Sequence, residues 1–136
     1  MIENVDPKRV WDSLQADKSA RLVDVRTNAE WAYVGLPDLE ATGQDPVLIP
    51  WQVFPTMQVN AQFVDHMRQA GLTPDNKIYF LCRSGVRSQA AAQAAVAAGF
   101  PQAFNIVDGF EGPPDAEGHR GKLAGWKASG LPWSQR

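Results

Sequence analysis

One continuous segment constrains the fold of this chain more than any other. It begins with the apolar run KIYFLC at 77–82, which is typical of a strand covered on both faces in a parallel sheet. A short polar loop, RSGVR, follows at 83–87, and the alanine-rich stretch at 88–98 predicts a helix that ends before Gly99. A buried strand that passes directly into a helix favours an α/β fold.

The rest of the chain alternates between strand and helix patterns in the same way. Asp6 and Pro7 predict the N-cap and first residue of a helix, and Thr27 and Glu30 have the spacing of a capping box that opens another. We expect Glu30 to serve only as the capping partner of Thr27. Further strands are predicted at 21–26, 47–49 and 103–107, and further helices at 60–70, with Asn60 as the cap, and at 123–129. The alternation predicts a single domain over 1–136, with a central, largely parallel sheet of about five strands and helices on both faces.

The composition is that of an ordinary globular protein and argues against several classes. A chain of 136 residues can bury a core without disulfides or metal, and a net charge of −2 gives no general attraction to nucleic acid or to an anionic membrane. The single cysteine cannot form an internal disulfide, the first residues carry no signal-peptide pattern, and no apolar run approaches the ~18 residues of a membrane span. We therefore expect a cytoplasmic protein with a reduced thiol and with neither nucleic acid nor membrane as a partner.

The loop that begins at Cys82 has the composition of an anion site. A tight turn here would aim several backbone N–H groups at its centre, beside the positive N-terminal end of the following helix. Gly85 permits a positive φ, and the two arginines add full charges. These features favour the thiolate form of Cys82, which is the nucleophile of sulfur chemistry. We expect Cys82 to be catalytic and the substrate-binding residues to be Arg83, Ser84, Gly85, Val86 and Arg87.

A cysteine at the end of a strand is more often a small buried apolar residue. Two arginines and a glycine beside it argue against that interpretation, because a buried charge is costly unless it is paired. Asp24 and Arg26 leave another predicted strand at the same edge of the sheet, where ligands of α/β proteins gather. We expect these two residues, with Ser88, to support the loop by pairing with its groups; the alternative for the first two is a surface ion pair. Arg83 is expected to point outward, whereas Arg87 could brace the loop or meet substrate.

On these motifs the chain resembles the rhodanese-homology domain family over most of its length. The most specific match is FLCRSGVRSQAAAQAAVAAGF, and LVDVRTNAEW, FNIVDGFEG and GWKASGLPW resemble flanking segments of the family. The resemblance implies a rhodanese-like fold and a sulfurtransferase, in which Cys82 takes sulfane sulfur from a donor such as thiosulfate and carries it as a persulfide. A thiophilic acceptor, such as cyanide or a thiol, then receives the sulfur.

The resemblance also bears on partners and on one loop. It implies a small sulfur-containing anion, or a thiol or persulfide, as donor, a thiophile as acceptor, and no cofactor. Residues 111–121 look like a loop insertion found in some bacterial members.

Two other functions stay open on sequence alone. A cysteine-dependent phosphatase uses a related loop with five residues between cysteine and arginine, whereas four separate Cys82 from Arg87, and Ser88 stands where the phosphatase arginine would be. The shorter loop is expected to fit sulfur and small sulfur anions better than phosphate esters. A non-catalytic binding or regulatory domain of the same fold is expected to lose the cysteine or the loop glycine, and this chain keeps both.

Two further groups of residues invite a functional interpretation. Asp115, Glu117 and His119 alternate as metal ligands can, but no second histidine or cysteine lies nearby, so no metal site is expected. Trp51 and Phe54 follow a strand end and are expected either to border a pocket or to cap the core.

Overall fold

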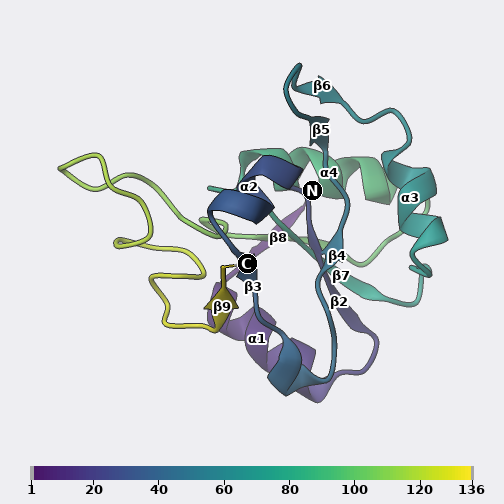
Figure 1. The fold of residues 1–136 in the computed structure, drawn as a ribbon. Coiled ribbons are helices and arrows are strands. Elements are labelled where there is room, and N and C mark those ends of the chain that lie inside the picture. Colours follow the sequence, from purple (N-terminus) through teal and green to yellow (C-terminus); the bar gives the residue numbers. More distant parts are fainter. Residues whose placement is uncertain (1, 136) are drawn as a thin grey trace.

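The computed structural model describes residues 2–135, and its centre is a five-stranded sheet in the order β1-β8-β7-β2-β4, parallel throughout (Figure 1). Its strands are β1 (Glu3–Val5), β2 (Ala20–Asp24), β4 (Val47–Leu48), β7 (Lys77–Leu81) and β8 (Ala103–Ile106). The helices are α1 (Pro7–Ala16), α2 (Asn28–Tyr33), α3 (Phe63–Gln69), α4 (Val86–Ala97) and the short 3-10 helix η1 (Glu40–Thr42). The predicted α/β fold with a parallel sheet of about five strands is confirmed.

The central strand β7 divides the core into two layers. Ile78 and Phe80 point to one face, where they pack with residues of α3 and α4, and Tyr79 and Leu81 point to the other face, where they pack with residues of α1. Both faces of β7 are therefore buried, which explains its near-continuous apolar sequence. The predicted helices on both faces are confirmed. Within residues 2–135, no helix is both long enough and apolar enough to cross a lipid bilayer.

Local sequence signals begin the helices beside the sheet. The Asp6 side chain accepts the N–H of Lys8, with Pro7 as the first helical residue of α1. At α2 both bonds of the capping box form: the Thr27 hydroxyl accepts the N–H of Glu30, and the Glu30 carboxylate accepts the N–H of Thr27. The predicted starts of these two helices are confirmed.

One helix prediction was wrong in part, and another was wrong altogether. Helix α3 begins at Phe63 with Gln62 at its N-cap position, so Asn60 is not the cap; its side chain instead accepts the N–H of Gln62 in the preceding turn. The segment 123–129 forms turns and no helix. The reason is Gly125, whose φ of +98° is left-handed and interrupts the helical path.

Short strands were missed because two or three residues cannot display a period. Besides β1, they comprise β3 (Leu36–Pro37), which pairs antiparallel with β9 (Trp133–Ser134), and β5 (Gln52–Val53), which pairs antiparallel with β6 (Gln58–Val59). Strand β1 adds the outer edge of the sheet beside β8, and its residue Asn4 lies opposite Asn105.

Candidate active site

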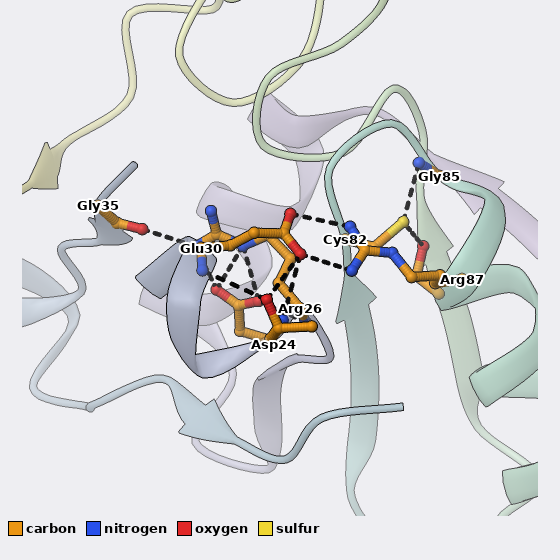
Figure 2. Close-up of polar contacts among 9 residues, drawn as sticks. Asp24, Arg26, Glu30, Gly35, Cys82, Gly85 and Arg87 are labelled. Atoms are coloured by element: carbon orange, nitrogen blue, oxygen red, sulfur yellow. Dashed lines mark hydrogen bonds and ion pairs between the residues drawn. The ribbon is translucent and has the colours of Figure 1, made fainter. Parts of the chain in front are cut away.

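Cys82 lies immediately after β7, beneath the loop that leads into α4 (Figure 2). Its sulfur receives two hydrogen bonds, from the N–H of Gly85 at 3.0 Å and from the hydroxyl of Ser88 at 3.2 Å. Gly85 has a φ of +110°, so the predicted positive φ at this position is confirmed. The sequence brings a nucleophilic atom and two donors together within seven residues.

The surroundings of the sulfur differ from the expected ring of amides. Among the described residues, Gly85 supplies the only backbone N–H that donates to the sulfur. Cys82 itself is 1% exposed and belongs to the apolar core on the α4 side of the sheet, where it packs with Val25 and Phe80. Because the thiol lies under the loop, a side-chain hydroxyl from the first turn of α4 serves in place of further amides. The sulfur therefore has apolar walls and two polar donors.

Arg87 is held by a carboxylate that the sequence did not assign to the loop. Its guanidinium donates to both oxygens of Glu30, at 2.6 and 2.9 Å, and the two side chains are only 17% and 20% exposed. Glu30 therefore caps α2 and also braces α4, so the expectation that it serves Thr27 alone was wrong. This pair of hydrogen bonds orients Arg87 toward α2, as the dashed lines in Figure 2 show.

The ion pair shifts the titration of both partners. Burial alone pushes the pKa of Glu30 upward, but the hydrogen bonds and charge of Arg87, with the N–H of Thr27, outweigh it and lower that pKa below its usual 4.5. The hydrogen bonds that Arg87 donates to Glu30 raise the pKa of Arg87, against the opposing effect of burial. A carboxyl whose pKa is lowered by folding stabilises the folded state above its unfolded pKa, and that stability is lost as the pH falls through the folded value.

Replacing Glu30 tests this brace. Glu30→Gln is expected to lower the free energy of unfolding at neutral pH by about 1–2 kcal/mol, because one partner of a charged, half-buried hydrogen bond is lost. As the pH falls below 4.5 the difference between variant and wild type should shrink, because the carboxyl is protonated first in the unfolded chain and, at lower pH, in the folded protein as well. Denaturant unfolding across this range measures both effects.

A matched control is Asp65→Asn, which breaks an exposed ion pair with Arg68 at 3.8 Å. It should change the stability by less than about 0.5 kcal/mol. Equal stability of Glu30→Gln and wild type at neutral pH would show that the brace contributes nothing.

Asp24 and Arg26 form a fully buried ion pair with a distance of 2.7 Å. The sequence predicted that they pair with groups of the loop; they instead bind each other, and Arg26 also donates to the carbonyl of Gly35 at 2.7 Å. The guanidinium lies 4.3 Å from the ring centre of Phe110, whose N–H donates to the carbonyl of Cys82 at 2.7 Å. Phe110 thus connects this ion pair to the backbone of the loop.

The remaining loop residues lie toward solvent. Arg83 is exposed, as predicted, Val86 is 77% exposed, and Ser84 is half-buried. The carbonyl of Arg83 accepts the N–H groups of Glu111 and Gly112, at 2.9 and 3.1 Å. These bonds attach the beginning of the 111–121 segment to the loop, so a segment far along the chain stabilises the backbone beside the thiol.

The acidic and histidine residues of the 111–121 segment shape a turn. The Asp115 carboxylate accepts the N–H groups of Glu117 and His119, at 2.9 and 2.8 Å. Within residues 2–135 no group of three or more potential ligands lies close enough together to hold a metal ion.

Two hollows of the surface lie away from the thiol. They have volumes of about 250 and 550 Å³, both adjoin Asp38 and Glu40, and neither is lined by a residue of the 82–88 segment. Trp51 packs edge-on against Phe63 with 5.2 Å between ring centres, so it caps the core, whereas Phe54 is 53% exposed.

Asn105 is a polar residue of the site that the sequence analysis missed. It lies in β8, is 4% exposed, and contacts both Ser88 and Gly85. The signal that could have found it is a lone amide in the otherwise apolar strand AFNI. Buried amides are kept in cores only with hydrogen-bond partners, and those partners lie here around the thiol.

Known proteins are similar to this chain over most of its length. A protein-family model described as the STR4 middle domain matches residues 3–136. An uncharacterized protein, RP600, of Rickettsia prowazekii is 34% identical over 134 residues, covering 98% of each chain. The chloroplastic rhodanese-like domain-containing protein 4 of Arabidopsis thaliana is 28% identical and covers 93% of this chain, which corresponds to 24% of the plant protein. The crystal structure of Rv0390 from M. tuberculosis is 43% identical, with 98% of each chain covered and a TM-score of 0.89.

Proposed function

Because this chain belongs to the STR4 middle-domain family of rhodanese-like domains, we propose that it is a sulfurtransferase that carries sulfur as a persulfide on Cys82. The observation that carries the proposal is the pair of donors on the Cys82 sulfur, from Gly85 at 3.0 Å and Ser88 at 3.2 Å. Such donors stabilise negative charge on sulfur at small reorganisation cost. A lone thiol of this kind works only where it stays reduced, and we place it in the cytoplasm.

In the first half-reaction the Cys82 thiolate attacks the outer sulfur of a donor such as thiosulfate. A bond forms between the two sulfur atoms, the bond from the outer sulfur to the sulfonate sulfur breaks, and sulfite leaves with the electron pair. The negative charge of the thiolate passes to the outer sulfur of the new persulfide. Gly85 and Ser88 stabilise the attacking thiolate, and exposed Arg83 attracts the anionic donor.

In the second half-reaction a thiophile attacks the outer sulfur of the persulfide. With cyanide, a carbon–sulfur bond forms, the sulfur–sulfur bond breaks, and its electron pair returns to Cys82 as the thiolate while thiocyanate leaves. No step requires an external proton, oxidant or metal. The two donors again receive the charge of the leaving thiolate.

The position of Arg87 favours sulfur over phosphate chemistry. A phosphatase needs a free guanidinium to bind the oxygens of a phosphate ester in a bidentate manner. Here both hydrogen-bonding arms of Arg87 are bound to Glu30, so this guanidinium acts as a brace. The exposed guanidinium of Arg83 remains available to a small anion that approaches the loop from solvent.

Steady-state kinetics test the proposal. With thiosulfate and cyanide as substrates, thiocyanate should form with ping-pong kinetics, since the first product leaves before the acceptor binds. Sulfite release in the absence of cyanide should stop at one equivalent per chain. Hydrolysis of an aryl phosphate that depends on Cys82, without any thiocyanate formation, would contradict the proposal.

A further inference from the structure

We propose that Asn105, a residue of β8 outside the loop, positions both hydrogen-bond donors of the Cys82 sulfur. The inference deepens the proposed function and rests on it where turnover is concerned. Its structural basis is a set of contacts around one buried amide, which is 4% exposed.

The first donor is positioned through the backbone of Gly85. The Asn105 Nδ2 atom donates to the carbonyl of Gly85 at 3.2 Å. Gly85 has the left-handed φ of +110°, and its own N–H donates to the sulfur. Because the carbonyl and the N–H belong to one residue, holding the carbonyl restricts the φ and ψ of Gly85 and therefore the direction of its N–H. Asn105 thus holds Gly85 in the conformation that aims the donor at Cys82.

The second donor is positioned through the hydroxyl of Ser88. This hydroxyl carries one proton and has two acceptors within reach, the Cys82 sulfur and the Oδ1 atom of Asn105. Ser88 is fully buried, so no solvent competes for that proton. The Oδ1 atom therefore holds the hydroxyl by accepting this proton whenever the proton is not directed at the sulfur.

The orientation of the Asn105 amide is fixed by its other neighbours. Its Nδ2 atom faces three acceptors: the Gly85 carbonyl, the Asn4 Oδ1 atom at 2.9 Å and the Gln89 Oε1 atom at 3.2 Å. A reversed amide would place an oxygen against the Gly85 carbonyl, which cannot donate. The Oδ1 atom must therefore face Ser88. Strand β1, which the sequence did not reveal, supplies the Asn4 contact through its pairing with β8.

This arrangement lets the Ser88 proton follow the charge on the sulfur. While Cys82 is a thiolate, the proton points to the sulfur. When sulfur is loaded, the charge moves to the outer sulfur atom, and the proton turns to the Asn105 Oδ1 atom. In both states the buried hydroxyl donates to an acceptor, and in the thiolate state the Oδ1 atom of Asn105 is the group that gives up the Ser88 proton. Asn105 is thus a positioning residue that acts through Ser88 and Gly85.

Three measurements on Asn105→Leu test the proposal. Alkylation of Cys82 by iodoacetamide at one fixed pH should slow by about tenfold, since hydrogen bonds to a charged atom are weakened. The NMR resonance of the Gly85 amide proton should shift upfield, because the hydrogen bond from this amide to the Cys82 sulfur is weakened or lost. In turnover, kcat should fall by about the same factor as alkylation while KM changes little, because charge stabilisation and not donor binding is affected.

Two further variants separate positioning from simple loss of structure. In the Ser88→Ala background, Asn105→Leu should slow alkylation less than it does in wild type, because the Ser88 hydroxyl, one of the two donors that Asn105 positions, is already absent. Should Asn105→Leu fail to fold, Asn4→Ala removes one support of the amide at an exposed residue, and should slow alkylation by about two- to threefold.

The matched control is Asn76→Leu. This asparagine donates to the carbonyl of Ser19 and precedes β7, at the opposite end of that strand from Cys82. It should leave alkylation and the Gly85 resonance unchanged. Alkylation at the wild-type rate in folded Asn105→Leu would overturn the role of Asn105. Absence of sulfur transfer by the wild type would instead overturn the proposed function, and the alkylation and NMR results would still stand.

Discussion

Cys82→Ser is expected to lower thiocyanate formation by about a thousandfold or more, the size of effect typical of a lost nucleophile. The substitution exchanges sulfur for the smaller oxygen, which can still accept the hydrogen bonds of Gly85 and Ser88. A neutral hydroxyl is a far weaker nucleophile and forms no persulfide. Steady-state assays at saturating thiosulfate and cyanide measure the loss, and thermal unfolding of both proteins checks that the fold persists.

The surface variant Asp65→Asn is the control for differences in protein handling and concentration. The Asp65 side chain is 69% exposed and lies outside the loop. The turnover of this variant should equal that of the wild type. If Cys82→Ser kept more than about a tenth of the activity, the sulfur would have to be carried elsewhere, and this chain has no other cysteine.

Gly109→Ala is expected to destabilise the protein by more than about 3 kcal/mol. Gly109 has a φ of +60°, and a methyl group there would overlap the carbonyl of Cys82 and lie 2.6 Å from the carbonyl carbon of Arg83. Those neighbours are backbone atoms, which cannot rotate away as a side chain does. The segment that contains Phe110 and Glu111 would have to leave the loop and lose its hydrogen bonds to the same two residues.

Gly118→Ala separates the overlap from the left-handed conformation. Gly118 also has a positive φ, +83°, but a methyl group there would meet no atom within 4 Å. Its cost should be only about 1–2 kcal/mol, the penalty for a left-handed residue with a side chain. Chemical denaturation of the two variants gives the comparison; similar costs would mean that the close approach at Gly109 is unimportant.

The central part of the site could be predicted from the sequence because its signals are local. Residues 77–88 contain the strand, the cysteine, the glycine with positive φ and the hydroxyl in one continuous stretch. The capping box at Thr27 is equally local, since its two partners are three residues apart. Patterns that span so few residues reflect the local geometry of one strand, turn or helix and require no contact with a distant segment.

What could not be predicted depends on contacts between distant segments. Arg87 and Glu30 are 57 positions apart, and nothing in either neighbourhood marks them as partners. Asn4 and Asn105 meet only because β1 pairs with β8, and a strand of three residues displays no period. The predicted helix at 123–129 failed for a different reason: Gly125 lies against the carbonyls of Asp108 and Gly109, and this tertiary packing overrides local propensity.

Intact-protein mass spectrometry after incubation with thiosulfate shows whether Cys82 holds the transferred sulfur. We expect a mass increase of one sulfur atom per chain, which cyanide removes and which is absent from Cys82→Ser. An unchanged mass in the wild type under conditions that load a known sulfurtransferase, or an added sulfur that persists in Cys82→Ser, would contradict this expectation.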